Sequence, residues 1–352
     1  MRSKMNWLYI VFCLLAVALA TKSASATGSV LNDPGEPGSV LVFPLFETGT
    51  NDATQEITQF EISVACPNGS TCTDGQDVDI RMHWVCFNSI NCQERDFTLA
   101  TTVNGTIRFD PDGHCYPPSN ANNFFDTCGN VVPPPCREGY LIAWVVDEAN
   151  GSIKFDGLVG DAVLREHATA VTAYNAIAIQ AGGALATGAS TNLSYGGKPP
   201  TGHLNFNGVA YKELTNTVIG SVHYDGPDPS TGTTSQTSLI LLTLDTRSNL
   251  LNNPVSVNLN FYNEIEQLNS NNTIFYCGSE TYLGDLGETT AFGYKGLVES
   301  TFAQKIPFLG TGDKTGNVSI VGLVLTREDL DTKHYAYPLY DNSIPLATSF
   351  WP

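Results

Sequence analysis

The chain has 352 residues, of which only 15% are charged, and its formal net charge at pH 7 is −18. Such an acidic surface repels phosphate backbones and anionic lipid, which disfavours nucleic-acid and membrane partners. The 32 glycines and 19 prolines, together with many Asn, Ser and Thr residues, favour short strands joined by turns. We therefore expect a mainly all-β protein, built as a disulfide-braced antiparallel β-sandwich in two halves with one short central helix.

Residues 1–26 have the pattern of a cleaved secretory signal peptide. Arg2 and Lys4 precede an apolar stretch at 7–20, and small residues at 24–26 form a cleavage site. The apolar stretch is shorter than the roughly 20 residues of a membrane span. We expect the mature chain to be secreted to the extracellular space or cell surface, without membrane insertion.

The rest of the chain divides by composition into four segments. We predict a flexible N-terminal arm at 27–38, a disulfide-rich β-domain with a terminal helix at 39–183, a Gly/Ser/Asn-rich connection at 184–208, and a second β-domain with an aromatic C-terminal tail at 209–352.

Strand patterns dominate the first half. Residues 39–46 form an apolar strand in which Pro44 indicates an edge or a bulge. Residues 59–66 and 78–87 alternate between apolar and polar, and we expect them to pair as antiparallel neighbours. Asn104-Gly105 is a turn signal that predicts a hairpin between 99–103 and 106–109.

The segment 139–183 holds a predicted strand pair followed by the predicted helix. Strands at 140–147 and 152–159 flank the turn signal Asn150-Gly151. Asp161 is suited to capping an Ala-rich helix over 162–174. The alternative is a strand from Val171, since residues 171, 173, 177 and 179 also fit a period of two.

The second half continues the strand pattern. We predict strands at 217–223, 237–244, 255–267, 273–277 and 319–326, before an aromatic and proline-rich tail.

Eight cysteines follow the signal segment: Cys66, Cys72, Cys86, Cys92, Cys115, Cys128, Cys136 and Cys277. An even number in an exported chain indicates four disulfides. Close spacing predicts the local pairs Cys66–Cys72 and Cys86–Cys92, and one remaining bridge should use Cys277 to tie the halves together. No cysteine or histidine spacing typical of zinc, haem or thioredoxin-like sites is present.

Three segments resemble a known group of sequences. PGSVLVFPLF near the start, GYLIAWVVDE and FDGLVGDAVL are similar to uncharacterised exported β-rich proteins of bacteria that open with a PGSVLVFP-like strand. The likeness extends into SLILLTLDTRSN and VNLNFYNE. It implies a bacterial, exported protein and supplies neither a function nor catalytic residues.

Two carboxylates in the second half are the best candidates for catalysis. In the predicted strand 255–267, Glu264 and Glu266 would lie on one face with Asn258, Asn260 and Tyr262. Side chains two residues apart on a strand are about 6.5 Å apart, a separation that suits a glycosidase-like pair. A polar strand face is more often simply solvated. GxSxG, SxxK and HExxH motifs are absent, so the sequence favours a protein that is not an enzyme.

Calcium is the only cofactor for which the sequence offers ligands. Asp110 and Asp112 lie in a DPDGH turn, and Asp77 and Asp79 belong to a second acidic cluster. Neither stretch has the full EF-hand pattern, and turn formation explains the same residues.

Two functional classes remain. The first is an extracellular structural or interaction protein, a surface, adhesive or filament subunit that associates with itself or with other extracellular proteins. In this class the arm 27–38 would lead Val40, Leu41, Val42 and Phe43 into pairing with a neighbouring chain. The alternative is a carbohydrate-binding or carbohydrate-active β-sandwich that uses Tyr262, Glu264 and Glu266, or Tyr335 and Tyr337.

Overall fold

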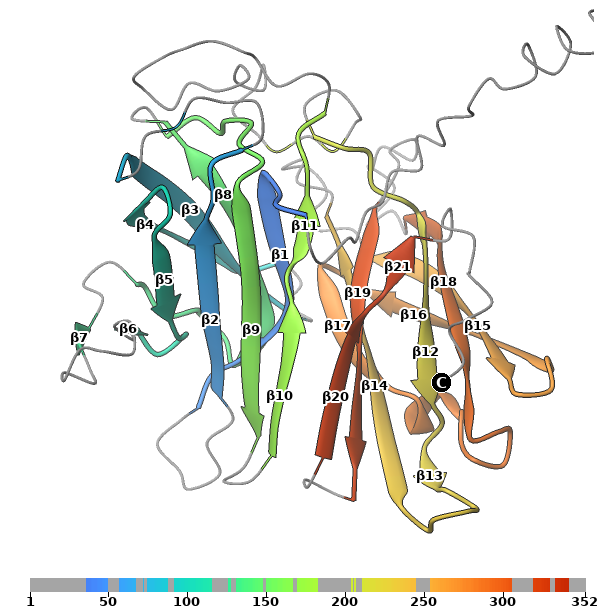
Figure 1. The fold of residues 1–352 in the computed structure, drawn as a ribbon. Helices are drawn as coiled ribbons and strands as arrows, with labels where there is room; N and C mark the ends of the chain where they lie inside the picture. The colour runs from blue at the N-terminus through green and yellow to red at the C-terminus, as the bar shows by residue number, and fades with distance from the viewer. Residues whose placement is uncertain are drawn as a thin grey trace, which may run out of the picture.

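The computed structural model describes residues 36–49, 57–67, 72, 75–87, 92–115, 126–127, 131–147, 150–166, 170–182, 204, 206, 211–244, 254–305, 319–329 and 333–341. These residues form four antiparallel sheets (Figure 1), as the all-β prediction required. The predicted signal peptide, residues 27–35 of the arm and most of the connection 184–208 lie outside the described residues. No helix among the described residues is long and apolar enough to cross a membrane.

The first half is a sandwich of two sheets. The inner sheet has the order β11-β1-β8-β3-β4, with β1 at Val40–Glu47, β3 at Asp77–Cys86, β4 at Glu94–Thr102, β8 at Glu138–Val146 and β11 at Ile177–Ile179. The outer sheet has the order β10-β9-β2-β5-β6-β7, with β2 at Ile57–Val64, β5 at Thr106–Phe109, β6 at His114–Cys115, β7 at Asp126–Thr127, β9 at Leu158–Glu166 and β10 at Ala170–Asn175.

The second half is another sandwich. Its inner sheet has the order β13-β14-β19-β20, with β13 at Gly226–Pro227, β14 at Thr234–Thr243, β19 at Ile320–Glu328 and β20 at Lys333–Pro338; β17 at Gly278–Tyr282 also pairs with β14. Its outer sheet has the order β16-β15-β18-β12-β21, with β12 at Thr217–His223, β15 at Val255–Asn263, β16 at Leu268–Phe275, β18 at Lys295–Lys305 and β21 at Tyr340–Asp341. A 3-10 turn, η1, spans Gly284–Leu286.

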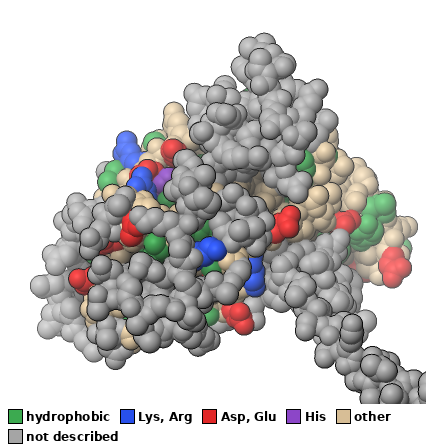
Figure 2. Space-filling view, turned by 90° about the horizontal axis from the view of Figure 1, so that it is seen from above, with side chains coloured by type: hydrophobic (Ala, Val, Ile, Leu, Met, Phe, Trp, Pro, Cys, Tyr) green, Lys and Arg blue, Asp and Glu red, His purple; other side chains and the backbone are tan. Residues whose placement is uncertain are grey.

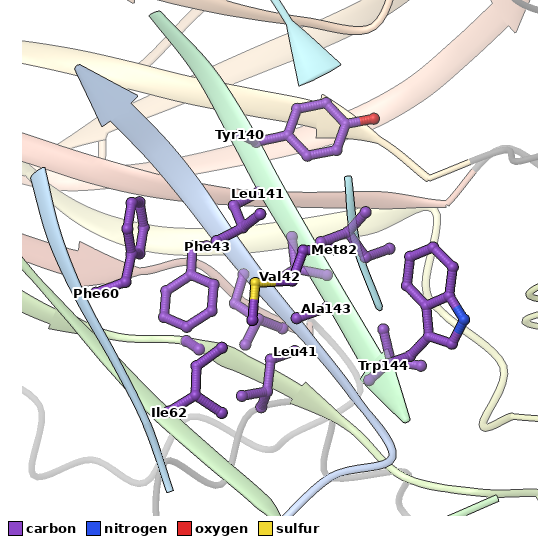
Figure 3. Packing of buried hydrophobic residues seen from close by; sticks show 14 of the residues in the cluster. Leu41, Val42, Phe43, Phe60, Ile62, Met82, Tyr140, Leu141, Ala143 and Trp144 are labelled. Atoms are coloured by element: carbon purple, nitrogen blue, oxygen red, sulfur yellow. The ribbon is translucent and has the colours of Figure 1, made fainter. Parts of the chain in front are cut away.

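The inner strands are buried on both faces. All eight residues of β1 and nearly all of β8, β14 and β19 are buried, whereas β2 alternates between buried and half-buried positions. Figure 3 shows Leu41 and Phe43 of β1 pointing toward Phe60 and Ile62 of β2. Strands β14 and β19 of the second half also contact β1, and Ile240 belongs to the same core cluster. The core of the first half therefore extends into the second half, which also has a separate core between its own two sheets.

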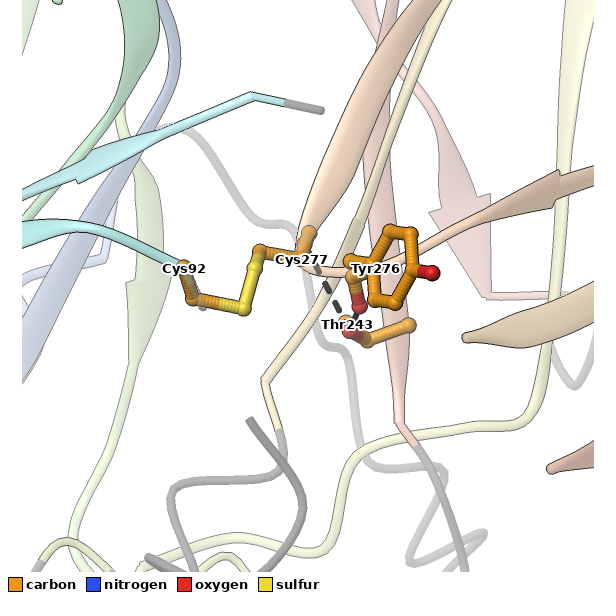
Figure 4. Close-up of a disulfide and its surroundings, with 4 residues drawn as sticks. All are labelled: Cys92, Thr243, Tyr276 and Cys277. Carbon is orange, nitrogen blue, oxygen red and sulfur yellow. Dashed lines mark hydrogen bonds between the residues drawn. A yellow bond between two sulfur atoms is a disulfide. The ribbon is translucent and has the colours of Figure 1, made fainter. Parts of the chain in front are cut away.

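Three pairs of described cysteines form disulfides. Cys66–Cys72 is paired as predicted, with 5.6 Å between the Cα atoms. The predicted pair Cys86–Cys92 is wrong, because Cys86 pairs with Cys136 and Cys92 pairs with Cys277. Cys277 ties the halves together as expected, but its partner is Cys92 and not one of the cysteines left over by the prediction (Figure 4). Thr243 donates to the carbonyl oxygen of Cys277 beside this bridge. Cys128 and the side chain of Cys115 lie outside what the structure describes.

The predicted central helix is wrong. Residues 162–166 lie in strand β9 and residues 170–174 lie in strand β10, and these two strands pair antiparallel. Asp161 therefore lies within β9 and caps nothing. The alternative reading of a strand from Val171 holds, since β10 and β11 cover that region. Ala162 and Leu164 are fully buried in the core, and residues 158–165 of β9 pair with β2.

Three pairing predictions in the first half also need correction. The strands predicted at 59–66 and 78–87 lie in opposite sheets, where the tilted rings of Phe60 and Trp84 meet across the core at 5.6 Å between ring centroids. The turn at Asn104 exists, with φ of 65°, but it connects β4 to β5 across the two sheets. The predicted return strand 152–159 is reduced to one bridge at Ser152 before β9 begins. Pro44 lies at a bulge in β1 and not at a sheet edge.

Removal of the bridge between the halves should cost much more stability than removal of the local bridge. Cys92 and Cys277 are separated by 185 residues, and Cys66 and Cys72 by 6. Loop-closure entropy predicts a loss of about 5 kcal/mol for Cys92→Ser/Cys277→Ser and about 2 kcal/mol for Cys66→Ser/Cys72→Ser. Urea unfolding followed by circular dichroism measures both. Equal losses would contradict the role given to the long bridge.

Candidate interaction surface

The outer face of the sheet β16-β15-β18-β12 carries mostly uncharged polar side chains. Val257, Leu259 and Phe261 of β15 point into the core of the second half, so the alternate residues point outward. We give the name amide face to a set of outward-facing polar residues on the four strands: Asn258, Asn260, Tyr262, Ser270, Asn272, Glu299, Thr301, Thr217 and Ser221. The prediction that Asn258, Asn260 and Tyr262 share one face is confirmed.

Cross-strand hydrogen bonds order the amide face. Ser270 Oγ donates to Asn260 Oδ1 at 2.9 Å, and Asn260 Nδ2 donates to Glu299 Oε2 at 3.3 Å. Thr217 Oγ1 donates to Thr301 Oγ1 at 3.1 Å. These contacts link β16 to β18 and β18 to β12, so the face is a preformed array of amides and hydroxyls.

Strand β16 ends this sheet, and its free edge is uncharged. Within the described chain β16 pairs only with β15, through all positions from Leu268 to Phe275. Its sequence, LNSNNTIF, contains no charged residue, no proline and no glycine. The backbone N–H groups of Ser270 and Asn272 donate to the side-chain Oδ1 atoms of Asn269 and Asn271, at 3.0 and 2.8 Å. These N–H groups therefore point away from β15, toward the open edge.

The other described edge strands carry features that discourage pairing. Strand β4 has Glu94, Arg95 and Asp96 in its first three positions. Strand β20 ends in Pro338. It also lies beside β10, so each of these two strands covers the edge of the other (Figure 1). Strands β7, β11, β13 and β21 have two or three residues, and β17 has five. Charges, proline and short length are the usual means by which proteins block edge-to-edge association, and β16 has none of them.

Exposed apolar side chains gather at the same edge. Leu268 and Ile274 of β16 are each 56% exposed, and Ile265 in the preceding turn is 73% exposed. With β16 they form what we call the β16 edge patch. Ile265 and Leu268 lie near the start of β16 and Ile274 lies six residues after Leu268, so exposed aliphatic side chains mark both ends of this edge. In the view of Figure 2, by contrast, the described Lys, Arg, Asp and Glu side chains are scattered.

A buried glutamate lies behind β16. Glu288 is fully buried, and its Oε1 accepts a hydrogen bond of 2.5 Å from Asn269 Nδ2, while Oε2 has no partner in the described structure. Burial raises the pKa of Glu288, and the Asn269 contact only partly opposes this. Asn271 Nδ2 donates to the carbonyl oxygen of Leu286 at 2.8 Å. The inner side of β16 is thus held by side-chain amides to the segment around η1.

The predicted carboxylate pair does not lie on a strand. Strand β15 ends at Asn263, and Glu264 and Glu266 belong to the turn that leads to β16, where Glu266 has a φ of 61°. Glu264 Oε1 accepts hydrogen bonds from the backbone N–H groups of Tyr294 and Lys295, at 2.7 and 2.6 Å. Burial alone would raise the pKa of Glu264, but these hydrogen bonds outweigh it and lower the pKa. Glu264 therefore closes a turn, and the geometric premise of the glycosidase-like pair is wrong.

The candidate calcium ligands are dispersed. Asp110 is fully buried, and its Oδ1 accepts the N–H of His114 at 2.9 Å, which closes the DPDGH turn. Asp112 is exposed, and Asp77 and Asp79 are exposed on β3. Among the described residues no group of three or more His, Cys, Asp or Glu side chains is arranged to hold a metal ion.

The predicted assembly strand lies inside the fold. Val40, Leu41, Val42 and Phe43 are fully buried, and β1 is paired with β11 on one side and β8 on the other. The last residue of the arm, Gly38, exchanges backbone hydrogen bonds with Leu158. Pairing of these residues with another chain would require β1 to be exchanged between chains.

The two tyrosines proposed for glycan binding lie on β20. Tyr335 and Tyr337 are 37% and 51% exposed, and their rings are stacked with centroids 6.5 Å apart. They lie in the inner sheet of the second half, whereas the amide face belongs to the outer sheet. The structure therefore does not bring them together with Tyr262 in one site.

Sequence reasoning missed an ion cluster between the halves. Arg327 of β19 donates to Glu280 of β17 at 3.3 Å and to Ser238 Oγ of β14 at 3.2 Å, and it lies 3.9 Å from Glu47 of β1. The side chains of all three charged residues are about nine-tenths buried. Their separation along the chain leaves no local motif. Because the cluster bridges β1 and β19, we assign it to the attachment of the two halves.

Comparison with known proteins gives no further guide to this surface. No family model matches the sequence, and no curated protein matches it.

Glu288→Gln should make the protein more stable at neutral pH. A carboxyl group with a raised pKa in the folded state lowers stability as pH rises through its unfolded pKa, and the full penalty is present above its folded pKa. Removal of this charge should raise the free energy of unfolding at pH 7 by roughly 1 kcal/mol and have little effect at pH 4. Denaturant titrations across this pH range, with Asp285→Asn in η1 as the control, measure the effect. A gain that is the same at both pH values would contradict the assignment.

Proposed function

We propose that this chain is an exported extracellular structural or interaction protein, a surface, adhesive or filament subunit that joins other chains by β-strand pairing. The observation that carries the proposal is the β16 edge patch, where an open and uncharged strand edge coincides with exposed Ile265, Leu268 and Ile274. Backbone pairing along such an edge supplies affinity, and alternate side chains supply specificity.

Two further features support an extracellular setting. The disulfides Cys66–Cys72, Cys86–Cys136 and Cys92–Cys277 are typical of an oxidising compartment. The start of the sequence has the pattern of an export signal. The arm 27–38 is a less favourable donor than the sequence indicates, because the strand that it leads into is already paired on both sides. We therefore place the docking edge at β16.

Photo-crosslinking in the native host tests this proposal. A photoreactive amino acid at Ile274 should form covalent adducts with a protein of the extracellular or surface fraction, because this side chain would lie within an interface. The same group at Ala100, exposed on the charged edge strand β4, should form few. Adducts are detected by a mobility shift and identified by mass spectrometry. Equal labelling at both positions, or none at Ile274, would count against the proposal.

The amide face supports glycan binding as a second candidate function. Its ordered Asn, Ser and Thr side chains present donors and acceptors that match sugar hydroxyls. A glycan array would detect such binding. Asn260→Ala should weaken any glycan signal about tenfold by removing two ordered hydrogen bonds, whereas Asp79→Asn on the first half should leave it unchanged. Equal signals for the two variants would remove the amide face as the site.

A further inference from the structure

We propose that the partner of β16 is the β16 strand of a second copy of this chain, paired antiparallel about a twofold axis at Asn271. This inference rests on the proposed function and adds the identity of the partner and the register. It would join two five-stranded outer sheets into one continuous sheet. In such an arrangement the same strand is used by both copies, so no other surface is required.

The positions of the two exposed aliphatic side chains of β16 select this register. Residues directly opposite each other in an antiparallel pair project from the same face, so an outward residue must meet an outward residue. A twofold axis at Asn271 places Leu268 opposite Ile274 of the second copy, and Ser270 opposite Asn272. The same contacts occur again on the other side of the axis. Both exposed aliphatic side chains of the strand, each 56% exposed in the single chain, would be covered in the same step.

The backbone of the open edge suits this pairing. The N–H groups of Ser270 and Asn272 point outward, and by alternation the edge displays the backbone groups of Leu268, Ser270, Asn272 and Ile274. These four residues are the ones that oppose one another in the proposed register. Each opposed pair can exchange two hydrogen bonds. The side-chain oxygens of Asn269 and Asn271 satisfy two of these N–H groups in the single chain and would be replaced by partner carbonyls.

Charge also favours a second copy. The chain has a net charge of −18, so two copies repel each other at most orientations. Pairing of two β16 strands places no charged side chains opposite each other, because the strand contains no charged residue. Self-pairing of β4 about a twofold axis at Arg95 would instead place Glu94 of each copy opposite Asp96 of the other. The neutral strip is therefore the place where close approach of two copies costs least.

Two variants that introduce charges of opposite sign on β16 test the proposal. In S270E/N272E the introduced carboxylates would lie opposite each other across the twofold axis, and in S270K/N272K the introduced amines would do so. Each variant alone should dimerise at least about tenfold more weakly than the unmodified chain, since like charges directly opposite are destabilising. An equimolar mixture should recover dimerisation, because each position then faces the opposite charge. T98E/A100E, with the same added charge on strand β4 of the first half, serves as the control.

Sedimentation velocity of the mature, disulfide-bonded chain from micromolar to near-millimolar concentration measures these associations. Thermal unfolding of each variant checks that the fold is kept. A second measurement fixes the register: N271C should form a disulfide-linked dimer on mild oxidation, because this position lies opposite itself, whereas N258C on β15 should not. The proposal would be overturned if S270E/N272E or S270K/N272K alone dimerised as well as the unmodified chain, or if their mixture failed to recover dimerisation.

The two proposals can fail separately. If the unmodified chain stays monomeric while Ile274 crosslinks to a different protein, the second-copy inference is wrong and the proposed function stands. If the chain is monomeric and Ile274 gives no adduct, both are wrong.

Discussion

The fold depends on the mutual burial of two inner sheets. Strands β1 and β8 are apolar on both faces, and so are most of β14 and β19, so neither sandwich can leave its inner sheet exposed to water. Each half covers the face that the other would expose, and this accounts for a core cluster that spans both. Close packing reaches the backbone: a Cβ atom on Gly160 of β9 would lie 2.7 Å from the ring of Phe43. The two halves therefore form one folding unit and are not independent domains joined by a linker.

The polar contacts at this junction follow from the same burial. Arg327 would be costly in an apolar interface without partners, and Glu280, Ser238 and Glu47 surround it, with the ring of Tyr282 at 5.7 Å from the guanidinium carbon. The Cys92–Cys277 bridge then limits separation of the halves even in the unfolded chain. Hydrophobic burial supplies the stability here, and the ion cluster mainly restricts how the two sheets can be placed.

Sequence patterns predicted strands well where apolar residues alternate with polar ones or form a continuous run. The bounds of β12 agree with the prediction, and those of β1, β3 and β8 agree to within a few residues. The helix at 162–174 failed because alanine favours helix locally, while the pairing of β9 with β2 places Ala162 and Leu164 in the core. The pairing of Cys86 and Cys92 failed for a related reason. Nearness in sequence is a poor guide when Cys92 faces the other half of the molecule.

The sequence predicted part of the candidate surface, the outward residues of β15, but not that β16 is an edge strand. Alternation correctly placed Asn258, Asn260 and Tyr262 on one face, but it extended the strand past Asn263 and so hid the turn and the start of β16. Whether a strand is an edge depends on the order of strands in the sheet, which is set by packing distant in sequence. No local pattern reports it.

Strands β4 and β16 differ in whether their edges carry charge. Both strands end a sheet, and both have eight or nine residues with an exposed face. Strand β4 has three consecutive charges at its start, as expected of an edge that must stay unpaired. In strand β16 the outward N–H groups of Ser270 and Asn272 donate to asparagine side chains, which water or a partner carbonyl can replace at little cost. In a chain with a net charge of −18, a strand edge that is long, neutral and flanked by exposed aliphatic side chains combines the conditions for strand pairing, and the remaining acidic surface limits association elsewhere.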